Sequence, residues 1–208
     1  MVDFKTQLKI AYDKDAKRRD NEQSRGGEWK NEIRAELVRI LNSENKKTIL
    51  ELGAGAGHDS KFFKSHGFDV LATDLSPEMV KLNQKRGTKA QVLDLYDLNC
   101  LTQKFDAIYS MNVLLHVPKN DLHLVLSKIH DRLSEGGIFF YGVNGRGQDT
   151  EETRTDGSKM NLPRFFSYLS DKSLFEFIGP YFEIIKLHNI DRNLDQNFHF
   201  QGLFLRRK

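Results

Sequence analysis

The sequence has 208 residues, of which 38% are hydrophobic and 29% are charged, and its formal net charge is +3 at pH 7. This composition is typical of one soluble globular domain and excludes a chain that is disordered throughout, while the small net charge gives no reason by itself to expect a nucleic-acid partner. The polar first residues, the lack of any apolar run of roughly 20 residues and the single cysteine, Cys100, together predict a cytoplasmic protein without a membrane-spanning helix.

The first part of the chain is predicted to contain two helices, at residues 4–19 and 28–41. From residue 48 onward, short apolar runs alternate with helical patterns, which predicts a parallel sheet. The predicted strands of this sheet lie at residues 48–52, 69–73, 90–95, 105–111 and 138–143.

Local signals mark the helices between these strands. The sequence Ser-Pro-Glu that begins at Ser76 is predicted to open one helix, with the serine side chain as its cap. Residues 122–133 carry an apolar stripe that predicts another helix, which Asn120 or Asp121 would cap and the glycines at 136–137 would end.

The last part of the chain begins with a polar, glycine-containing segment, residues 144–162. It is too long for a routine connection and is interpreted as either a disordered segment or a functional loop. A short helix is predicted after Ser170. The β-rich runs at 182–190 and 198–205 then predict an antiparallel pair that closes one edge of the sheet.

In an open parallel sheet, ligands bind beyond the carboxyl ends of the strands. Gly53, Gly55 and Gly57 follow the first predicted strand, where the lack of side chains lets a ligand approach the backbone. Asp74 ends the second predicted strand, 21 residues after Gly53, and this spacing suits a carboxylate that binds ribose hydroxyls. The alternative is that the glycines only form a tight turn and Asp74 only caps the next helix. The combined spacing favours a ligand that contains a nucleoside.

The glycine spacing does not match the dinucleotide fingerprint G-x-G-x-x-G, because His58 occupies the sixth position. Glu51 lies two residues before the first glycine. A carboxylate there would repel a pyrophosphate and attract a cationic headgroup. These two features favour a cationic nucleoside over NAD.

The sequence ELGAGAG, which begins at Glu51, resembles together with Asp74 the first two motifs of the class I S-adenosylmethionine-dependent methyltransferases. The resemblance covers about residues 48–205, because QVLDLYDL, FDAIYSMNVLLHV and LSEGGIFFYGV resemble the later motifs of the family in the same order. It implies a Rossmann-like, doubly wound α/β fold with seven strands, mostly parallel with an antiparallel C-terminal strand, and helices on both faces of the sheet. It also implies S-adenosyl-L-methionine as the cofactor.

The same resemblance implies roles for individual residues. The backbone of the glycine-rich loop would hold the amino-acid end of the cofactor, Asp74 the ribose and Asp94 the adenine amino group. Tyr12 and Trp29, from the opening helices, would cover the cofactor, although Trp29 could simply belong to the apolar face of its helix. The remaining expected cofactor contacts are Glu51, Gly53, Ala54, Gly55, Gly57, Leu75, Leu95, Met111 and Asn112.

Methyl transfer from a sulfonium mainly requires an acceptor placed in line and protected from water, and it requires a base only if the acceptor carries a proton. His116 is the catalytic candidate because its ordinary pKa suits proton removal, although it could instead only pack or hydrogen-bond in the wall of the site. Arg164, Phe165 and Tyr168 are the candidate substrate contacts, with Arg164 binding an acidic group. The alternative is a surface arginine beside buried aromatic residues.

The predicted function is methyl transfer to an oxygen or nitrogen of a small-molecule acceptor. The alternatives are an RNA or protein methyltransferase and a non-catalytic module that binds the cofactor. A nucleic-acid acceptor is disfavoured because SMNVL stands where the amino-group methylases of nucleic acids carry an acidic residue or asparagine followed by Pro-Pro-aromatic. A metal-dependent, catechol-type enzyme is disfavoured separately, because no set of carboxylate or amide metal ligands is visible. One domain is expected, with a helical lid at 1–45, a cofactor-binding core at 46–143, a substrate-side loop at 144–170 and a helix with a C-terminal hairpin at 171–208.

Overall fold

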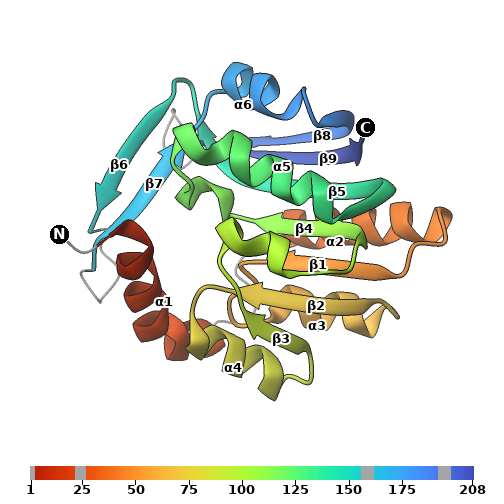
Figure 1. Ribbon diagram of the computed structural model, residues 1–208, viewed down its shortest axis with the longest axis horizontal. Coiled ribbons are helices and arrows are strands. Elements are labelled where there is room, and N and C mark those ends of the chain that lie inside the picture. The colour runs from red at the N-terminus through yellow and green to blue at the C-terminus, as the bar shows by residue number, and fades with distance from the viewer. Residues whose placement is uncertain (1–2, 22–26, 156–161, 192–197) are drawn as a thin grey trace. The chain divides into compact units, whose positions relative to one another are not determined.

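The structure of the protein is a computed structural model (Figure 1), and it describes residues 3–21, 27–155, 162–191 and 198–208. Seven strands form one mixed sheet in the order β3-β2-β1-β4-β5-β9-β8. The expected Rossmann-like fold with antiparallel C-terminal strands is therefore confirmed. The strands are β1 (Thr48–Leu52), β2 (Asp69–Asp74), β3 (Lys89–Val92), β4 (Phe105–Met111), β5 (Leu133–Arg146), β8 (Phe182–Asp191) and β9 (Phe198–Arg207).

Contacts along the chain define two compact units. The first consists of Met1–Leu95 with Thr155–Arg164, and the second consists of Tyr96–Arg154 with Phe165–Lys208. The expected division of a single domain into lid, core, loop and hairpin stays a prediction.

The described part of the first unit contains the helices α1 (Phe4–Asn21), α2 (Gly27–Ser43), α3 (His58–Ser65) and α4 (Pro77–Lys85). The parallel strands β1, β2 and β3 pair in register, and α3 and α4 pack against them. Residues 49–52 are all buried, which is typical of a strand covered on both faces. Helix α1 lies against α4, so the N-terminal segment contacts the same helix that follows Asp74 (Figure 1).

Two local predictions in the first unit have different outcomes. The Ser76 hydroxyl accepts a hydrogen bond from the Met79 N–H at 3.2 Å, which confirms Ser76 as the cap of α4. The third strand was expected at residues 90–95, but β3 ends at Val92 and a 3-10 helix, η1 (Leu95–Cys100), follows. Asp94 and Leu95 therefore lie beyond the strand, because its last register pair joins Val92 to Asp74.

The second unit has an aromatic core. Strands β4 and β5 pair in parallel, β5 and β9 pair antiparallel, and β9 pairs with β8. Tyr109 stacks on Phe140 at a ring-centroid distance of 5.1 Å, and Phe140 packs on Phe204 at 5.0 Å, so rings from three adjacent strands meet. Helices α5 (Leu122–Arg132) and α6 (Asp171–Ile178) pack on each other in this unit.

The ends of α5 differ from the sequence prediction. Asp121 precedes the helix without a side-chain capping bond, and its carboxylate instead accepts a hydrogen bond from the Tyr96 hydroxyl at 2.6 Å. The helix ends at Arg132, and the glycines at 136–137 lie within β5, not at the end of the helix. The register of β4 and β5 shifts there, between Phe105 and Ala107, and the positive φ of Gly136 accommodates the irregular backbone.

The sequence of residues 144–162 predicts either a disordered segment or a functional loop, but its described part contains strand residues. Strand β5 continues to Arg146, and β6 (Thr150–Arg154) pairs with β7 (Arg164–Tyr168) in a separate two-stranded sheet. All five residues of β6, Thr-Glu-Glu-Thr-Arg, are polar, and they are half-buried and exposed in alternation. This pattern suits a strand of which neither face is fully covered. Residues 156–161 lie outside the described part.

Within the described ranges, no helix combines the length and hydrophobicity needed to cross a membrane. The same residues contain no group of three or more His, Cys, Asp or Glu side chains placed to hold a metal ion.

Candidate functional site

The glycine-rich turn joins β1 to α3, and its glycines serve different purposes. Gly55 has a φ of +54°, and a Cβ atom added there would meet no atom within 4 Å. Gly57 has a φ of +84°, and a Cβ there would lie 2.7 Å from Asn83 Cγ and 3.2 Å from Asn83 Cα. Gly57 thus lets α3 approach α4 closely, whereas Gly55 leaves open space beside the backbone.

Asp74, at the end of β2, is bound to this turn. Its Oδ2 accepts a hydrogen bond from the Gly55 N–H at 2.8 Å, and its Oδ1 accepts one from the Ser76 N–H at 2.8 Å. Burial raises the pKa of Asp74, while these two backbone bonds act in the opposite direction. A carboxylate has about four lone-pair positions, so Asp74 retains the capacity to accept two further hydrogen bonds.

Glu51 lies behind the turn and is only 3% exposed. Ser60, on α3, donates a hydrogen bond to its carboxylate. Burial raises the pKa of Glu51 well above its ordinary value, and the nearby charge of Asp59 raises it further. Asp59 forms ion pairs with Lys30 at 2.9 Å and Arg34 at 2.8 Å, which connect α2 to α3.

Helix α1 contacts several chain segments that carry expected cofactor residues. Asp13 accepts hydrogen bonds from the Ser76 hydroxyl at 2.5 Å and from the Glu78 N–H at 3.3 Å, directly after Asp74 and Leu75. Lys5 pairs with Asp94 at 3.0 Å. Neither Asp13 nor Lys5 was identified from the sequence, because nothing in a single helix indicates which distant turn it will contact.

Tyr12 of α1 lies close to two arginines. The guanidinium of Arg19 lies 4.9 Å from the centre of the Tyr12 ring and that of Arg164 lies 5.6 Å from it, and Arg164 also hydrogen-bonds to Tyr12. Burial raises the pKa of Tyr12 in spite of these positive charges. The structure thus brings together Tyr12 and Arg164, which the sequence assigned to different ligands. Trp29 lies half-buried in the first turn of α2.

In the second unit, Met111 ends β4 and Asn112 follows it in an unusual conformation. The φ of Asn112 is +55°, and its N–H donates to the Gly142 carbonyl at 2.7 Å. Its Oδ1 is buried and has no hydrogen-bond partner among the described residues. A left-handed, non-glycine residue with an unsatisfied buried acceptor is typical of a functional site.

His116 lies in a short 3-10 helix, η2 (Leu114–His116), after β4. Its Nδ1 lies 2.7 Å from the carbonyl oxygen of Phe165 on β7, and its ring lies 4.9 Å from that of Phe166. A carbonyl can only accept, so Nδ1 carries the proton and the neutral ring has its lone pair on Nε2.

On β7 the ring of Phe166 lies beside that of Tyr168, as expected because alternate residues of a strand share a face. The rings of Phe166 and Tyr168 are parallel, with centroids 5.8 Å apart. Tyr168 is buried, and the guanidinium of Arg146 lies 4.5 Å from the centre of its ring. Phe166 and Arg146 were missed because the strand period of this segment is not visible in RFFSY.

Three features define a nucleoside-binding α/β protein of the Rossmann-like class. They are a glycine-rich turn after the first strand, an acid at the end of the second strand that is bound to that turn, and a strand order that reverses after β1. Residues 25–177 match the family of methyltransferase domains. The chain belongs to this family, which confirms the expectation from its motifs.

Known proteins of this kind resemble the chain over much of its length. The malonyl-acyl-carrier-protein O-methyltransferase of Hamiltonella defensa is 27% identical over 158 residues, which cover 75% of this chain and 60% of that protein. The 1,6-didemethyltoxoflavin N1-methyltransferase of Burkholderia thailandensis, solved with S-adenosylhomocysteine, superimposes with a TM-score of 0.69 at 19% identity, covering 98% of this chain and 88% of the other. The magnesium protoporphyrin IX methyltransferase of Synechocystis, solved with bound S-adenosylmethionine, superimposes with a TM-score of 0.71 at 15% identity. This similarity covers 100% of this chain and 99% of the other. The last two similarities concern the fold alone.

Proposed function

We propose that this protein is an S-adenosylmethionine-dependent methyltransferase that transfers a methyl group to an oxygen or nitrogen of a small-molecule acceptor. The observation that carries the proposal is the Asp74 carboxylate, which is fixed by the Gly55 N–H in a chain of the methyltransferase family. The names of related proteins include both O- and N-methyltransferases, and this range supports an acceptor of either kind.

The residues of the first unit suit the cofactor. Asp74 would accept the two ribose hydroxyls with its remaining lone pairs, and Leu75 would pack on the adenine. The open space beside Gly55 would admit the amino-acid end of the cofactor, with Glu51 behind it. Bound S-adenosylmethionine supplies a methyl group activated by the sulfonium charge.

His116 is the proposed general base for an acceptor that carries a proton. Its hydrogen bond to the Phe165 carbonyl holds Nδ1 protonated, so Nε2 is the atom that would take the proton from the acceptor. The same bond stabilises the imidazolium that forms, because Nδ1–H donates to the carbonyl in both charge states. Arg164, Phe165 and Tyr168 stay the proposed acceptor contacts, and Arg164 would bind an acidic group.

The test is calorimetry with S-adenosylhomocysteine on the wild type and on Asp74→Ala. Loss of two hydrogen bonds to ribose should weaken binding by about 10- to 100-fold. Asp69→Ala is the matched control, because Asp69 begins the same strand and its carboxylate pairs with Lys89 at the exposed surface, at 2.8 Å. The control should bind like the wild type.

Undiminished binding by Asp74→Ala would refute the ribose role, and binding of NADH with no affinity for S-adenosylhomocysteine would refute the cofactor. Tight binding without hydrolysis or transfer to any acceptor would favour a non-catalytic module. Binding of RNA that falls steeply with salt would favour a macromolecular acceptor.

A further inference from the structure

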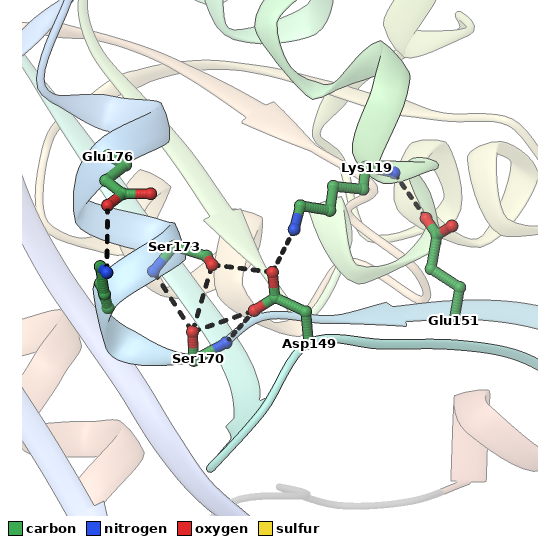
Figure 2. A network of polar contacts seen from close by, with 7 residues as sticks. Lys119, Asp149, Glu151, Ser170, Ser173 and Glu176 are labelled. Atoms are coloured by element: carbon green, nitrogen blue, oxygen red, sulfur yellow. Dashed lines mark hydrogen bonds and ion pairs between the residues drawn. The ribbon is translucent and has the colours of Figure 1, made fainter.

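Asp149, between β5 and β6, is the centre of a polar network in the second unit (Figure 2). Its carboxylate accepts hydrogen bonds from the Ser170 N–H at 2.8 Å, the Ser170 hydroxyl at 2.9 Å and the Ser173 hydroxyl at 2.7 Å. Lys119 donates to the same carboxylate from the other side. Burial alone would raise the pKa of Asp149, but these donors, with Lys119 foremost, hold it well below its ordinary value. Asp149 is therefore ionised at neutral pH.

The network holds the chain segment that follows His116. Lys119 lies three residues after His116 and begins a second short 3-10 helix, η3 (Lys119–Asp121). Its side chain pairs with Asp149, and its backbone N–H donates to the Glu151 carboxylate of β6 at 2.6 Å. Residues 114–121, here called the His116 turn, are thus attached to the β5–β6 segment through both the side chain and the backbone N–H of Lys119 (Figure 2).

The same carboxylate holds the chain segment that follows Phe165. Ser170 lies two residues after the end of β7 and caps α6. Asp149 therefore binds both segments that meet in the hydrogen bond between His116 Nδ1 and the Phe165 carbonyl.

Capping α6 does not by itself require Asp149. The Ser170 hydroxyl already accepts a hydrogen bond from the Ser173 N–H at 3.3 Å, which is the ordinary capping bond of a helix. The bond from Lys119 satisfies no group of α6, and it joins Asp149 to the chain segment that follows His116.

We propose that Asp149 is a positioning residue for His116: with Lys119 it keeps the His116 turn against β7, so that Nδ1 stays protonated and Nε2 keeps the lone pair. The inference rests on the proposed role of His116 as the base. Without the carboxylate, the turn and β7 can separate, and the imidazole loses the acceptor that selects its tautomer.

The test is ¹H–¹⁵N NMR of the histidine rings at about pH 9, above the ordinary histidine pKa, with His116→Gln identifying the His116 signals. The wild type should show a protonated Nδ1 and an unprotonated Nε2. Asp149→Ala and Lys119→Met should both lose this single tautomer, whereas Lys119→Arg, which keeps the charge and the donors, should retain it. Glu176→Gln is the control, because its pair with Lys172 on α6 is exposed and lies outside the network.

A single Nδ1-protonated tautomer that persists in Asp149→Ala would overturn the positioning role, as would a wild-type ring protonated on Nε2. A general loss of folding is recognised by calorimetry, because every variant should bind S-adenosylhomocysteine within about twofold of the wild type if the effect is local. The readout requires no methyl transfer. A fixed tautomer without activity would therefore count against His116 as the base and leave the role of Asp149 intact.

Discussion

Gly55 and Gly57, in the turn after β1, allow the effects of ligand binding and of packing to be measured separately. Replacing either one by alanine adds the same methyl group at a backbone with positive φ, +54° at Gly55 and +84° at Gly57. At Gly55 the added Cβ enters open space, whereas at Gly57 it would overlap the side chain and approach the backbone of Asn83. Gly55→Ala is therefore expected to impair cofactor binding, and Gly57→Ala to impair folding.

The magnitudes follow from the two environments. The left-handed conformation costs an alanine about 1–2 kcal/mol at either position. Overpacking against Asn83, which is 1% exposed and donates a hydrogen bond to the Gly55 carbonyl at 2.6 Å, adds about 1–3 kcal/mol at Gly57. The free energy of unfolding should fall by about 1–2 kcal/mol in Gly55→Ala and by about 2–5 kcal/mol in Gly57→Ala.

Urea unfolding measures the change in the free energy of unfolding, and calorimetry with S-adenosylhomocysteine measures the change in cofactor binding. Gly55→Ala should bind at least about tenfold more weakly, which corresponds to roughly 1.4 kcal/mol, while its remaining stability keeps it folded at 25 °C. Equal destabilisation by the two substitutions would refute the packing role of Gly57. Normal binding by Gly55→Ala would refute the proposal that its backbone faces the cofactor.

Two further substitutions test the surroundings of the turn. Ser76→Ala removes both the cap of α4 and the donor to Asp13, so urea unfolding should show a loss of about 1–2 kcal/mol. Ser65→Ala, which removes exposed hydrogen bonds to the Phe62 carbonyl and to His66, should change the stability little. Glu51→Gln should become more stable relative to the wild type as pH rises above about 4.3, because the raised pKa of Glu51 makes the folded state hold its proton more tightly than the unfolded state does. A difference that is constant with pH would contradict that burial effect.

Elements specified by local patterns were predicted closely. The apolar runs at residues 48–52 and 105–111 are the strands β1 and β4 with the predicted limits, because a strand buried on both faces needs only a continuous apolar run. Ser76 was also recognised correctly, since a cap followed by proline satisfies the first turn of a helix with neighbouring residues alone.

Elements that depend on distant partners were predicted less well. The end of β3 is set by its pairing with β2, which stops at Asp74, and not by the apolar residues that follow Val92. Strands β6 and β7 contain no aliphatic residue, so their pairing could not be predicted from hydrophobic periodicity.

The same distinction explains which site residues could be predicted. The contact between Asp74 and Gly55 follows from topology, because neighbouring parallel strands end at the same edge of the sheet and their following turns must meet there. The partners of Asp149 lie 30 residues before it and 21 and 24 residues after it, in segments that no strand pairing aligns. Topology can place Asp74 beside the glycine-rich turn, but the groups that orient His116 come from irregular segments. For that reason the family can be recognised from its motifs, whereas the contacts proposed to select the tautomer of the base can be identified only from the structure.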